Sequence, residues 1–267
     1  GISSEELGLA NTASKLRGEA GTKVLVEISS MSGEFREVDL ERRSVDLRPV
    51  RTKRLRDDSH TIGYLRITQF SESVPQKTEE ALQELKEKEV EGLILDLRNN
   101  SGGLVSSGIA VADSLLSEKP VVETKNRNGI KDVIISQKET SFDGPMVTLV
   151  NKGTASASEI LAGSLQDNER SILMGEQTYG KGLIQSLKSL GEDSGIAITV
   201  ASYLTPKGNN IQGQGVTPNK FLDLPDATEY GSADDKWVRN AELYLGSLLE
   251  KEAEISLKTN VSSDDEI

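Results

Sequence analysis

Residues 146–185 place the tightest constraint on how this chain can fold. The stretch opens with the apolar run MVTLV, which has the length of a strand, and continues through the turn-forming residues NKG. The following residues, TASASEILAGSL, predict a helix with its apolar side chains on one face, and a short apolar strand follows at residues 172–174. The stretch therefore predicts a strand–turn–helix–strand unit.

Two polar side chains in this unit could carry chemistry. Ser156 lies among small residues at the predicted helix start, where its hydroxyl would be near backbone N–H groups that lack helical partners. Lys181 lies between two glycines in GEQTYGKG, where the backbone can closely approach a ligand. A lone serine there is more often a helix cap, and a lone lysine is more often solvated. These two residues by themselves do not establish a site.

Composition narrows the function classes. The chain has 267 residues, enough for one large or two modest domains, and its net charge of −12 disfavours nucleic acid and anionic membranes as partners. Because there is no cysteine, thiol nucleophiles, disulfides and thiolate metal sites are excluded. The single histidine, His60, lies in the polar run DDSH and is interpreted as a surface loop residue. A serine nucleophile here would therefore use a base other than histidine, and lysine is the natural substitute.

A second apolar run, GLILDL at residues 92–97, predicts a buried parallel strand. It ends in RNNSGG, and a helix follows to Leu116. Two adjacent glycines allow the backbone to turn sharply and to direct N–H groups at a ligand, although simple turn chemistry is the alternative. The remaining patterns predict helices at 3–17, 75–88 and 234–252, and strands at 22–28, 34–40, 62–70, 121–124, 133–136, 183–190 and 195–203.

The sequence motifs of this central stretch, residues 146–185, resemble those of a known family. The segments GTASASE, QD and GEQTYGKGLIQ occur in this order, and DLRNNSGGL precedes them. The segments YLTP and IQGQGVTP follow them. In these segments, and in the separation of Ser156 from Lys181, the chain resembles the carboxyl-terminal processing peptidases, or tail-specific proteases. These are serine peptidases that use a Ser/Lys dyad. The resemblance covers nearly all of residues 1–250 and is strongest over 92–218.

The resemblance implies an α/β (mixed α+β) fold, with a ClpP/crotonase-like β/α catalytic core preceded by a partial PDZ domain. The PDZ part is indicated by LRGEAGTKV at residues 16–24, for which a small α+β cap is the alternative. Since the carboxylate-binding loop of a PDZ domain would lie upstream of Gly1, we expect the chain to start inside that domain. The expected divisions are a PDZ-like part at 1–43, a linker at 44–61, the catalytic core with its C-terminal helix at 62–252, and a disordered acidic tail at 253–267.

The resemblance also implies roles for individual residues. Ser156 would be the nucleophile, Lys181 the general base, and Gln185 the residue that orients the lysine amine; an ordinary polar residue in a strand is the alternative for Gln185. The oxyanion hole would be formed by Gly102, preferred over Gly103, and by Ala157. The same stretch contains Ser158, interpreted as a helix cap, Glu159, interpreted as structural, and Asp167, which could support the site or be an ordinary polar residue at the helix end.

If Lys181 is the general base, its amine must be able to accept a proton. An amine with an ordinary pKa near 10.4 is almost entirely protonated at neutral pH and cannot accept a proton. Burial beside apolar neighbours lowers the pKa of a lysine by disfavouring its charged form. We therefore predict that Lys181 is largely buried in the active conformation, with no carboxylate paired to it.

The implied activity is endopeptidase cleavage near the C-terminus of protein substrates with exposed tails. It implies no cofactor, no metal and no nucleic acid, and it leaves the oligomeric state open. The implied compartment is extracytoplasmic: a periplasm, or the thylakoid lumen if the chain belongs to the cyanobacterial and plastid branch that processes a photosystem II reaction-centre precursor. One alternative is a module that binds peptide tails without cutting them. A crotonase-like acyl-thioester enzyme is disfavoured, because such enzymes lack the Ser156–Lys181 pattern and the chain has no basic cluster for a nucleotide.

Overall fold

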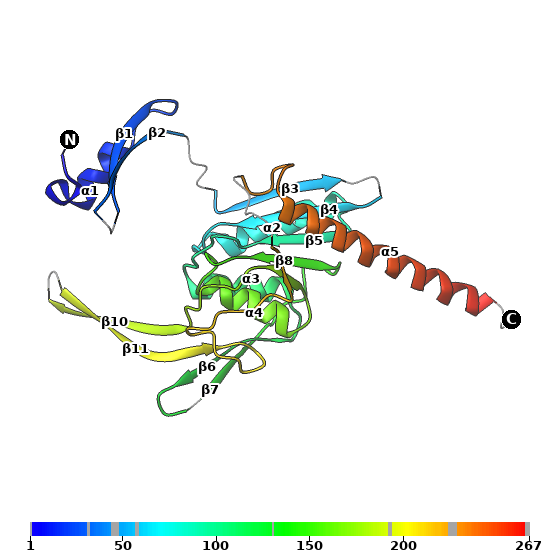
Figure 1. The fold of residues 1–267 in the computed structure, drawn as a ribbon. Coiled ribbons are helices and arrows are strands. Elements are labelled where there is room, and N and C mark those ends of the chain that lie inside the picture. The colour runs from blue at the N-terminus through cyan, green and yellow to red at the C-terminus, as the bar shows by residue number, and fades with distance from the viewer. Residues whose placement is uncertain are drawn as a thin grey trace. The chain divides into compact units, whose positions relative to one another are not determined.

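The computed structural model in Figure 1 describes residues 2–30, 33–43, 48–56, 59–129, 131–191, 194–223 and 229–264. The chain divides into two compact units, Gly1–Arg48 and Pro49–Ile267. The second unit contains every residue to which the sequence assigns a catalytic role.

The first unit consists of one helix and a hairpin. Helix α1 (Ser4–Leu16) is interrupted at Gly8, whose φ of 70° and ψ of 166° are not helical. Strands β1 (Lys23–Ser29) and β2 (Phe35–Glu41) pair in antiparallel register. The guanidinium of Arg42 donates to the carbonyl of Leu16 at 2.8 Å and so joins the end of the helix to the hairpin. The predicted helix and strands are confirmed, whereas the PDZ identity of this part stays a prediction.

The second unit is built on a six-stranded sheet in the order β12-β9-β8-β5-β4-β3. Its central strands run parallel, and β3 pairs antiparallel to β4 at one edge. The predicted linker therefore contains an edge strand. Four charged side chains in its sequence, VRTKRLR, obscure that strand in the sequence pattern. The strands are β3 (Val50–Arg56), β4 (Thr61–Ile67), β5 (Gly92–Asp96), β8 (Met146–Val150), β9 (Ile172–Gly175) and β12 (Lys220–Phe221).

Helices cover both faces of this sheet. On one face, α2 (Val74–Glu87), α3 (Val105–Leu115) and α4 (Ala157–Asp167) form a core with strand residues such as Leu95. On the other face, α5 (Lys236–Asp264) packs against the alternate strand residues, such as Ile94. Because both faces are covered, the central strands β5 and β8 are mostly apolar, as the runs at 92–97 and 146–150 predict.

Helix α5 is longer than the sequence predicts. It continues through Asp264, so most of the tail that was expected to be disordered is helical, and residues 265–267 lie outside the described part of the chain. The segment EKEAEISLK looks like an acidic tail by charge, but its Glu, Lys, Ala and Leu residues are good helix formers. The helix propensity of these residues therefore decides the structure of this segment, and its many charges do not prevent a helix.

A second sheet holds the residues that follow Lys181. It is antiparallel, in the order β10-β11-β6-β7, and it confirms the predicted strands at 121–124, 133–136, 183–190 and 195–203. The pairing of β10 with β11 shifts register between Ile184 and Gln185, where β11 has one extra residue, Val200. The strands are β6 (Pro120–Asn126), β7 (Lys131–Ile135), β10 (Leu183–Gly191) and β11 (Ser194–Leu204).

Truncation of Leu95 tests the central core. The side chain is fully buried (0% exposed), so Leu95→Ala is expected to lower the free energy of unfolding by about 2–5 kcal/mol through lost burial and a residual cavity. Leu243 is 70% exposed on α5, and Leu243→Ala is expected to change the free energy of unfolding by less than about 0.5 kcal/mol. Chemical denaturation of the two variants measures both values. Equal effects would contradict this assignment of the core.

Candidate active site

The predicted site residues gather at one edge of the six-stranded sheet. Ser156 follows the carboxyl end of β8, and Gly102 follows the carboxyl end of the neighbouring parallel strand β5. Ligand sites of open α/β sheets form at this edge. His60 precedes β4 and lies at the opposite edge, where its Nδ1 is 3.4 Å from Glu91 Oε1. The histidine is therefore not part of this site.

Ser156 has a strained backbone. Its φ of 59° and ψ of −119° lie in a region that residues other than glycine rarely adopt, at a cost on the order of 1–3 kcal/mol. It is half-buried at the N-cap position of α4, whereas the residues on either side of it are buried. A strained serine between a strand and a helix is the geometry with which hydrolases present a nucleophile. Ser158 does not cap the helix as expected, because it is buried and its hydroxyl donates to the carbonyl of Asn100 at 2.9 Å.

Glu159 joins the turn that contains Ser156 (the serine turn, residues 151–156) to the loop that contains Lys181 (the lysine loop, residues 176–182). Its carboxylate is fully buried, and Oε2 accepts the backbone N–H groups of Ser156 and of Lys181, each at 2.8 Å. Oε1 accepts the Thr178 hydroxyl at 2.5 Å and the Gly180 N–H at 2.7 Å. The amide nitrogens of Ser156 and Lys181 can therefore be no further apart than twice a hydrogen-bond length. The structural role expected for Glu159 agrees with these contacts.

Gly102 packs directly against the candidate nucleophile. A Cβ atom added at this glycine would lie 2.8 Å from Ser156 Cβ and 3.1 Å from the amide nitrogen of Ala157. Among the described residues, the Ala157 N–H at the start of α4 has no hydrogen-bond partner. The Gly102 N–H donates to Asn100 Oδ1 at 3.0 Å, whereas the Gly103 N–H has no partner within the described part of the chain. The structure thus brings Gly102, Ser156 and Ala157 together, with one of the two expected donors already engaged.

Lys181 and Gln185 adopt a different arrangement from the predicted one. Both residues are exposed, and neither side chain makes a hydrogen bond or ion pair with the described residues. The predicted burial of Lys181 and its bond to Gln185 are therefore not features of this conformation. The backbone of Lys181 is bonded to Glu159, whereas its side chain lies in solvent.

Asparagine side chains hold the two loops of the site together, which the sequence reasoning did not predict. Asn99 and Asn151 pair through two bonds, from Asn99 N–H to Asn151 Oδ1 at 2.8 Å and from Asn151 Nδ2 to Asn99 Oδ1 at 3.0 Å. Asn100 is fully buried; its carbonyl accepts the Ala155 N–H at 3.0 Å and its Nδ2 donates to the Ile67 carbonyl at 2.9 Å. The loops after β5 and β8 are thus fixed relative to each other. The signals in the sequence are the pair NN shortly after one buried strand and Asn151 directly after another.

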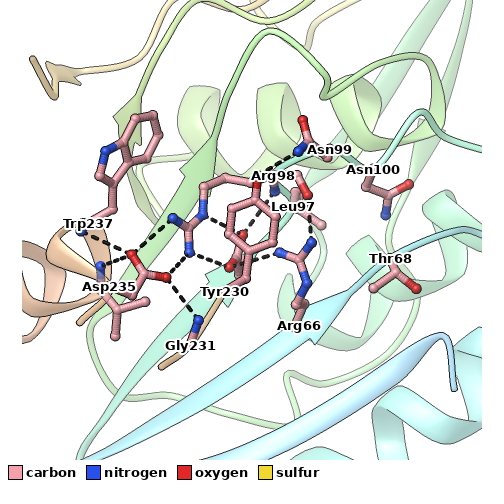
Figure 2. Close-up of polar contacts among 12 residues, drawn as sticks. Arg66, Thr68, Leu97, Arg98, Asn99, Asn100, Tyr230, Gly231, Asp235 and Trp237 are labelled. Atoms are coloured by element: carbon pink, nitrogen blue, oxygen red, sulfur yellow. Dashed lines mark hydrogen bonds and ion pairs between the residues drawn. The ribbon is translucent and has the colours of Figure 1, made fainter. Parts of the chain in front are cut away.

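A buried cluster of charged side chains lies next to the loop after β5 that contains Gly102 and Gly103 (the glycine loop, residues 99–103; Figure 2). Arg98 is fully buried, and its Nη2 lies 2.7 Å from Asp96 Oδ2 and 2.6 Å from Asp235 Oδ2. Arg66 Nη1 lies 3.0 Å from Asp96 Oδ2, so two arginines face two aspartates. Burial by itself would raise the pKa of Asp235, but hydrogen bonds from Arg98 and from backbone N–H groups, with the charge of Arg98, hold that pKa below its usual range.

The described residues contain no group of three or more His, Cys, Asp or Glu side chains placed to hold a metal ion. None of the helices in the described ranges is long and apolar enough to span a lipid bilayer.

Comparison with known proteins assigns the family. The profile of Peptidase family S41 matches residues 61–220, which is more than half of the chain. The chain belongs to peptidase family S41. The match contains the glycine loop, Ser156 and Lys181, and it agrees with the resemblance found in the sequence.

Individual relatives support this assignment. The carboxyl-terminal-processing protease of Synechocystis sp. is 44% identical over 229 residues, covering 84% of this chain and 53% of the relative. The carboxy-terminal processing protease CtpA of Bacillus subtilis is 34% identical and covers 91% of this chain and 52% of the relative. The structure of a photosystem II D1 C-terminal processing protease superposes with a TM-score of 0.66 at 37% identity, covering 80% of this chain and 59% of that chain. The chain thus spans about half the length of the curated relatives it matches.

Substitution of Glu159 tests its role as the link between the two loops. In Glu159→Gln an NH₂ group replaces an oxygen that accepts two hydrogen bonds, so one pair of donors loses its acceptor inside the protein. We expect the free energy of unfolding to fall by about 2–4 kcal/mol, and peptidase activity to fall with it, because hydrogen bonds to a charged group are worth about 1.5–3 kcal/mol each. Glu250→Gln, on an exposed position of α5, is the matched control. Wild-type stability in Glu159→Gln would show that these contacts do not hold the loops.

Asp235 makes the stability of the second unit depend on pH. Since its pKa is lowered in the folded state, its contribution is fully present above the unfolded value near 3.8 and is lost as the pH falls through the lower folded value. Asp235→Asn removes one partner of a buried ion pair and is expected to cost about 3 kcal/mol at pH 7. The difference from wild type should shrink below about pH 4. Chemical denaturation at several pH values measures this stability difference, with Asp234→Asn at an exposed position as the control. A difference that does not depend on pH would contradict a lowered pKa of Asp235.

Proposed function

We propose that this chain is the catalytic part of a serine-type endopeptidase that cleaves protein substrates near their C-terminus. Ser156 is the nucleophile, Lys181 the general base, and Gln185 the residue that orients the lysine amine. The backbone N–H groups of Ala157 and Gly102 stabilise the oxyanion. The substrates are proteins with exposed C-terminal tails, and the reaction requires no cofactor.

The observation that carries this proposal is the strained turn at Ser156 and its link to Lys181. A backbone in an unfavourable conformation persists only where the surroundings over-determine it, and such positions cluster at active sites. Here the surroundings are the buried Glu159, which accepts the N–H of both residues, and Gly102, which leaves no side chain over the serine. Membership of peptidase family S41 supports acyl transfer at a peptide bond as the chemistry of this arrangement.

The proposed reaction proceeds in two halves. Ser156 Oγ attacks the scissile carbonyl carbon while its proton passes to the neutral amine of Lys181, and the carbonyl oxygen becomes an oxyanion held by backbone N–H groups. Collapse of this intermediate breaks the C–N bond, and Lys181 gives the proton to the departing amine. Water then attacks the resulting ester, with Lys181 again accepting a proton, and the second collapse releases the new carboxyl terminus and the free serine.

Two local changes would convert the present arrangement into the reactive one. The exposed side chain of Lys181 must turn toward Ser156 and lose water, since a solvated amine remains protonated at neutral pH. The Gly102 N–H must release Asn100 Oδ1, or the free N–H of Gly103 must serve in its place. Catalytic contacts often become short and well aligned only once substrate is bound. We interpret the conformation as a resting one.

A groove beside the glycine loop could receive the substrate. Its volume is about 590 Å³, and it is lined by Gly103, Leu104 and residues 69–73. Among these residues Phe70 is buried, whereas Leu104 and Glu72 are exposed. Because the groove begins next to the glycine that touches Ser156, a peptide chain lying in it would bring a carbonyl group close to the nucleophile.

The compartment and the finer substrate class are inferred from relatives. Relatives of this chain include chloroplastic and cyanobacterial processing proteases. We infer an extracytoplasmic location, either a periplasm or the thylakoid lumen, and in the latter case a photosystem II reaction-centre precursor as the substrate. The resting geometry of Lys181 keeps one alternative in view, a module that binds peptide tails without cutting them.

Substitutions of the two proposed catalytic side chains test the function. With an unstructured tail peptide as substrate, Ser156→Ala is expected to lower kcat/KM by more than about 1,000-fold. Lys181→Arg should be equally inactive, because a guanidinium keeps its proton at any accessible pH. Lys152→Ala, which removes another exposed lysine of the same region, should retain activity. The wild-type rate should rise with pH through an apparent pKa well below the 10.4 of a free lysine.

The possible outcomes separate the candidate functions. Cleavage that survives Ser156→Ala would overturn the peptidase mechanism. Binding of the peptide without cleavage at any pH would instead support the binding module. Activity in Lys181→Arg would leave the serine in place and remove the lysine as its base.

A further inference from the structure

Tyr230 contacts both buried arginines of the charged cluster (Figure 2). The guanidinium carbon of Arg66 is 4.1 Å from the centre of its ring, and that of Arg98 is 4.4 Å away. An aromatic face attracts a guanidinium, most strongly where water is excluded. The ring therefore adds an attraction for each arginine to the ion pairs with the aspartates.

The hydroxyl of Tyr230 makes a separate contact with the glycine loop. It accepts a hydrogen bond from Asn99 Nδ2 at 2.5 Å. Asn99 has a φ of 55°, a left-handed conformation that asparagine tolerates better than most residues. Its backbone N–H and side-chain oxygen are both bonded to Asn151, on the nucleophile side of the site. Asn99 is thus held from the nucleophile side by Asn151 and from the other side by Tyr230.

The same loop continues directly into the proposed oxyanion hole. Asn100 follows Asn99, and its side-chain oxygen receives the Gly102 N–H. The backbone carbonyl of Asn100 accepts the hydroxyl of Ser158, inside α4. A shift at Asn99 would therefore move Gly102 relative to Ser156 through covalent and hydrogen-bonded neighbours, without any contact between Tyr230 and the substrate.

We propose that Tyr230 is a positioning residue for the glycine loop, and that its hydroxyl acts through Asn99 to set where the oxyanion donor lies. The inference rests on the proposed peptidase function. A displacement of about 1 Å at a reacting centre can cost on the order of 100-fold in rate, so one hydrogen bond at Asn99, three residues before Gly102, can affect turnover measurably. Because the effect concerns the oxyanion, it falls on kcat and leaves KM nearly unchanged.

Tyr230→Phe isolates the hydroxyl. Phenylalanine keeps the ring that contacts the two arginines and removes the hydroxyl that accepts from Asn99. With the tail peptide, we expect kcat to fall about tenfold while KM stays within about twofold, and the melting temperature to change little. The matched control is Tyr244→Phe. Tyr244 is also half-buried and lies against a cation, Lys220, but it belongs to α5, away from the glycine loop.

A second substitution tests whether the effect passes through Asn99. Glycine accepts a positive φ and has no side chain to bond to Tyr230, so Asn99→Gly removes this contact from the other side, together with the acceptor for Asn151 Nδ2. If Tyr230 acts through Asn99, then Tyr230→Phe has no further effect on kcat in the Asn99→Gly background. Additive losses would overturn the proposed route.

The test also separates this inference from the proposed function. If Ser156→Ala is inactive and Tyr230→Phe has the wild-type kcat, the positioning role is wrong and the peptidase assignment stands. If Ser156→Ala still cleaves, the peptidase mechanism fails, and the amide NMR resonances of Gly102 and Gly103 then decide the positioning role without activity. Their displacement in Tyr230→Phe, and not in Tyr244→Phe, supports it, and unchanged resonances overturn it.

Discussion

The site depends on one buried carboxylate that no cation neutralises. Placing Glu159 in the protein interior costs free energy that only good hydrogen bonds to the charged form can offset. Its four donors come from two segments, the serine turn and the loop of Thr178, Gly180 and Lys181. Because every donor must remain in place to keep the carboxylate satisfied, the two segments cannot drift apart without leaving a charge unpaired. The separation of the proposed nucleophile and base is therefore a condition of folding as well as of chemistry.

The glycine loop is also held by hydrogen bonds, but from neutral side chains. Asn99, Asn100 and Asn151 connect the ends of β5 and β8 through side-chain amides, which offer donors and acceptors at once. Parallel strands bring these loops side by side, but the sheet itself does not fix how the loops face each other. The amide contacts and the charged cluster around Arg98 supply that precision. The parallel sheet determines where the site lies, and its polar network determines the shape of the site.

The sequence predicted the parts of this structure that local patterns encode. The apolar runs at 92–97 and 146–150 are the central strands, and the segment around Ser156 indicated both the turn and the family. The sequence predicts a linker where β3 lies, because the charged side chains of this strand mask a pattern that only pairing with β4 stabilises. Asp235 gave no signal, since its partner Arg98 lies 137 residues earlier in the chain. The exposure of Lys181 could not be read from its glycine-rich surroundings, because they do not determine which way its side chain points.

The long separation between Arg98 and Asp235 has a consequence for the time at which the site becomes complete during synthesis. A ribosome makes the glycine loop, the serine turn and the lysine loop before it makes Tyr230 and Asp235. Until that last segment emerges, Arg98 has only part of its set of partners, and the loop above it lacks one of its two anchors. A chain that stops early therefore contains every proposed catalytic side chain but not the support that aligns them. The polar network of the site is therefore complete only once translation has passed Asp235.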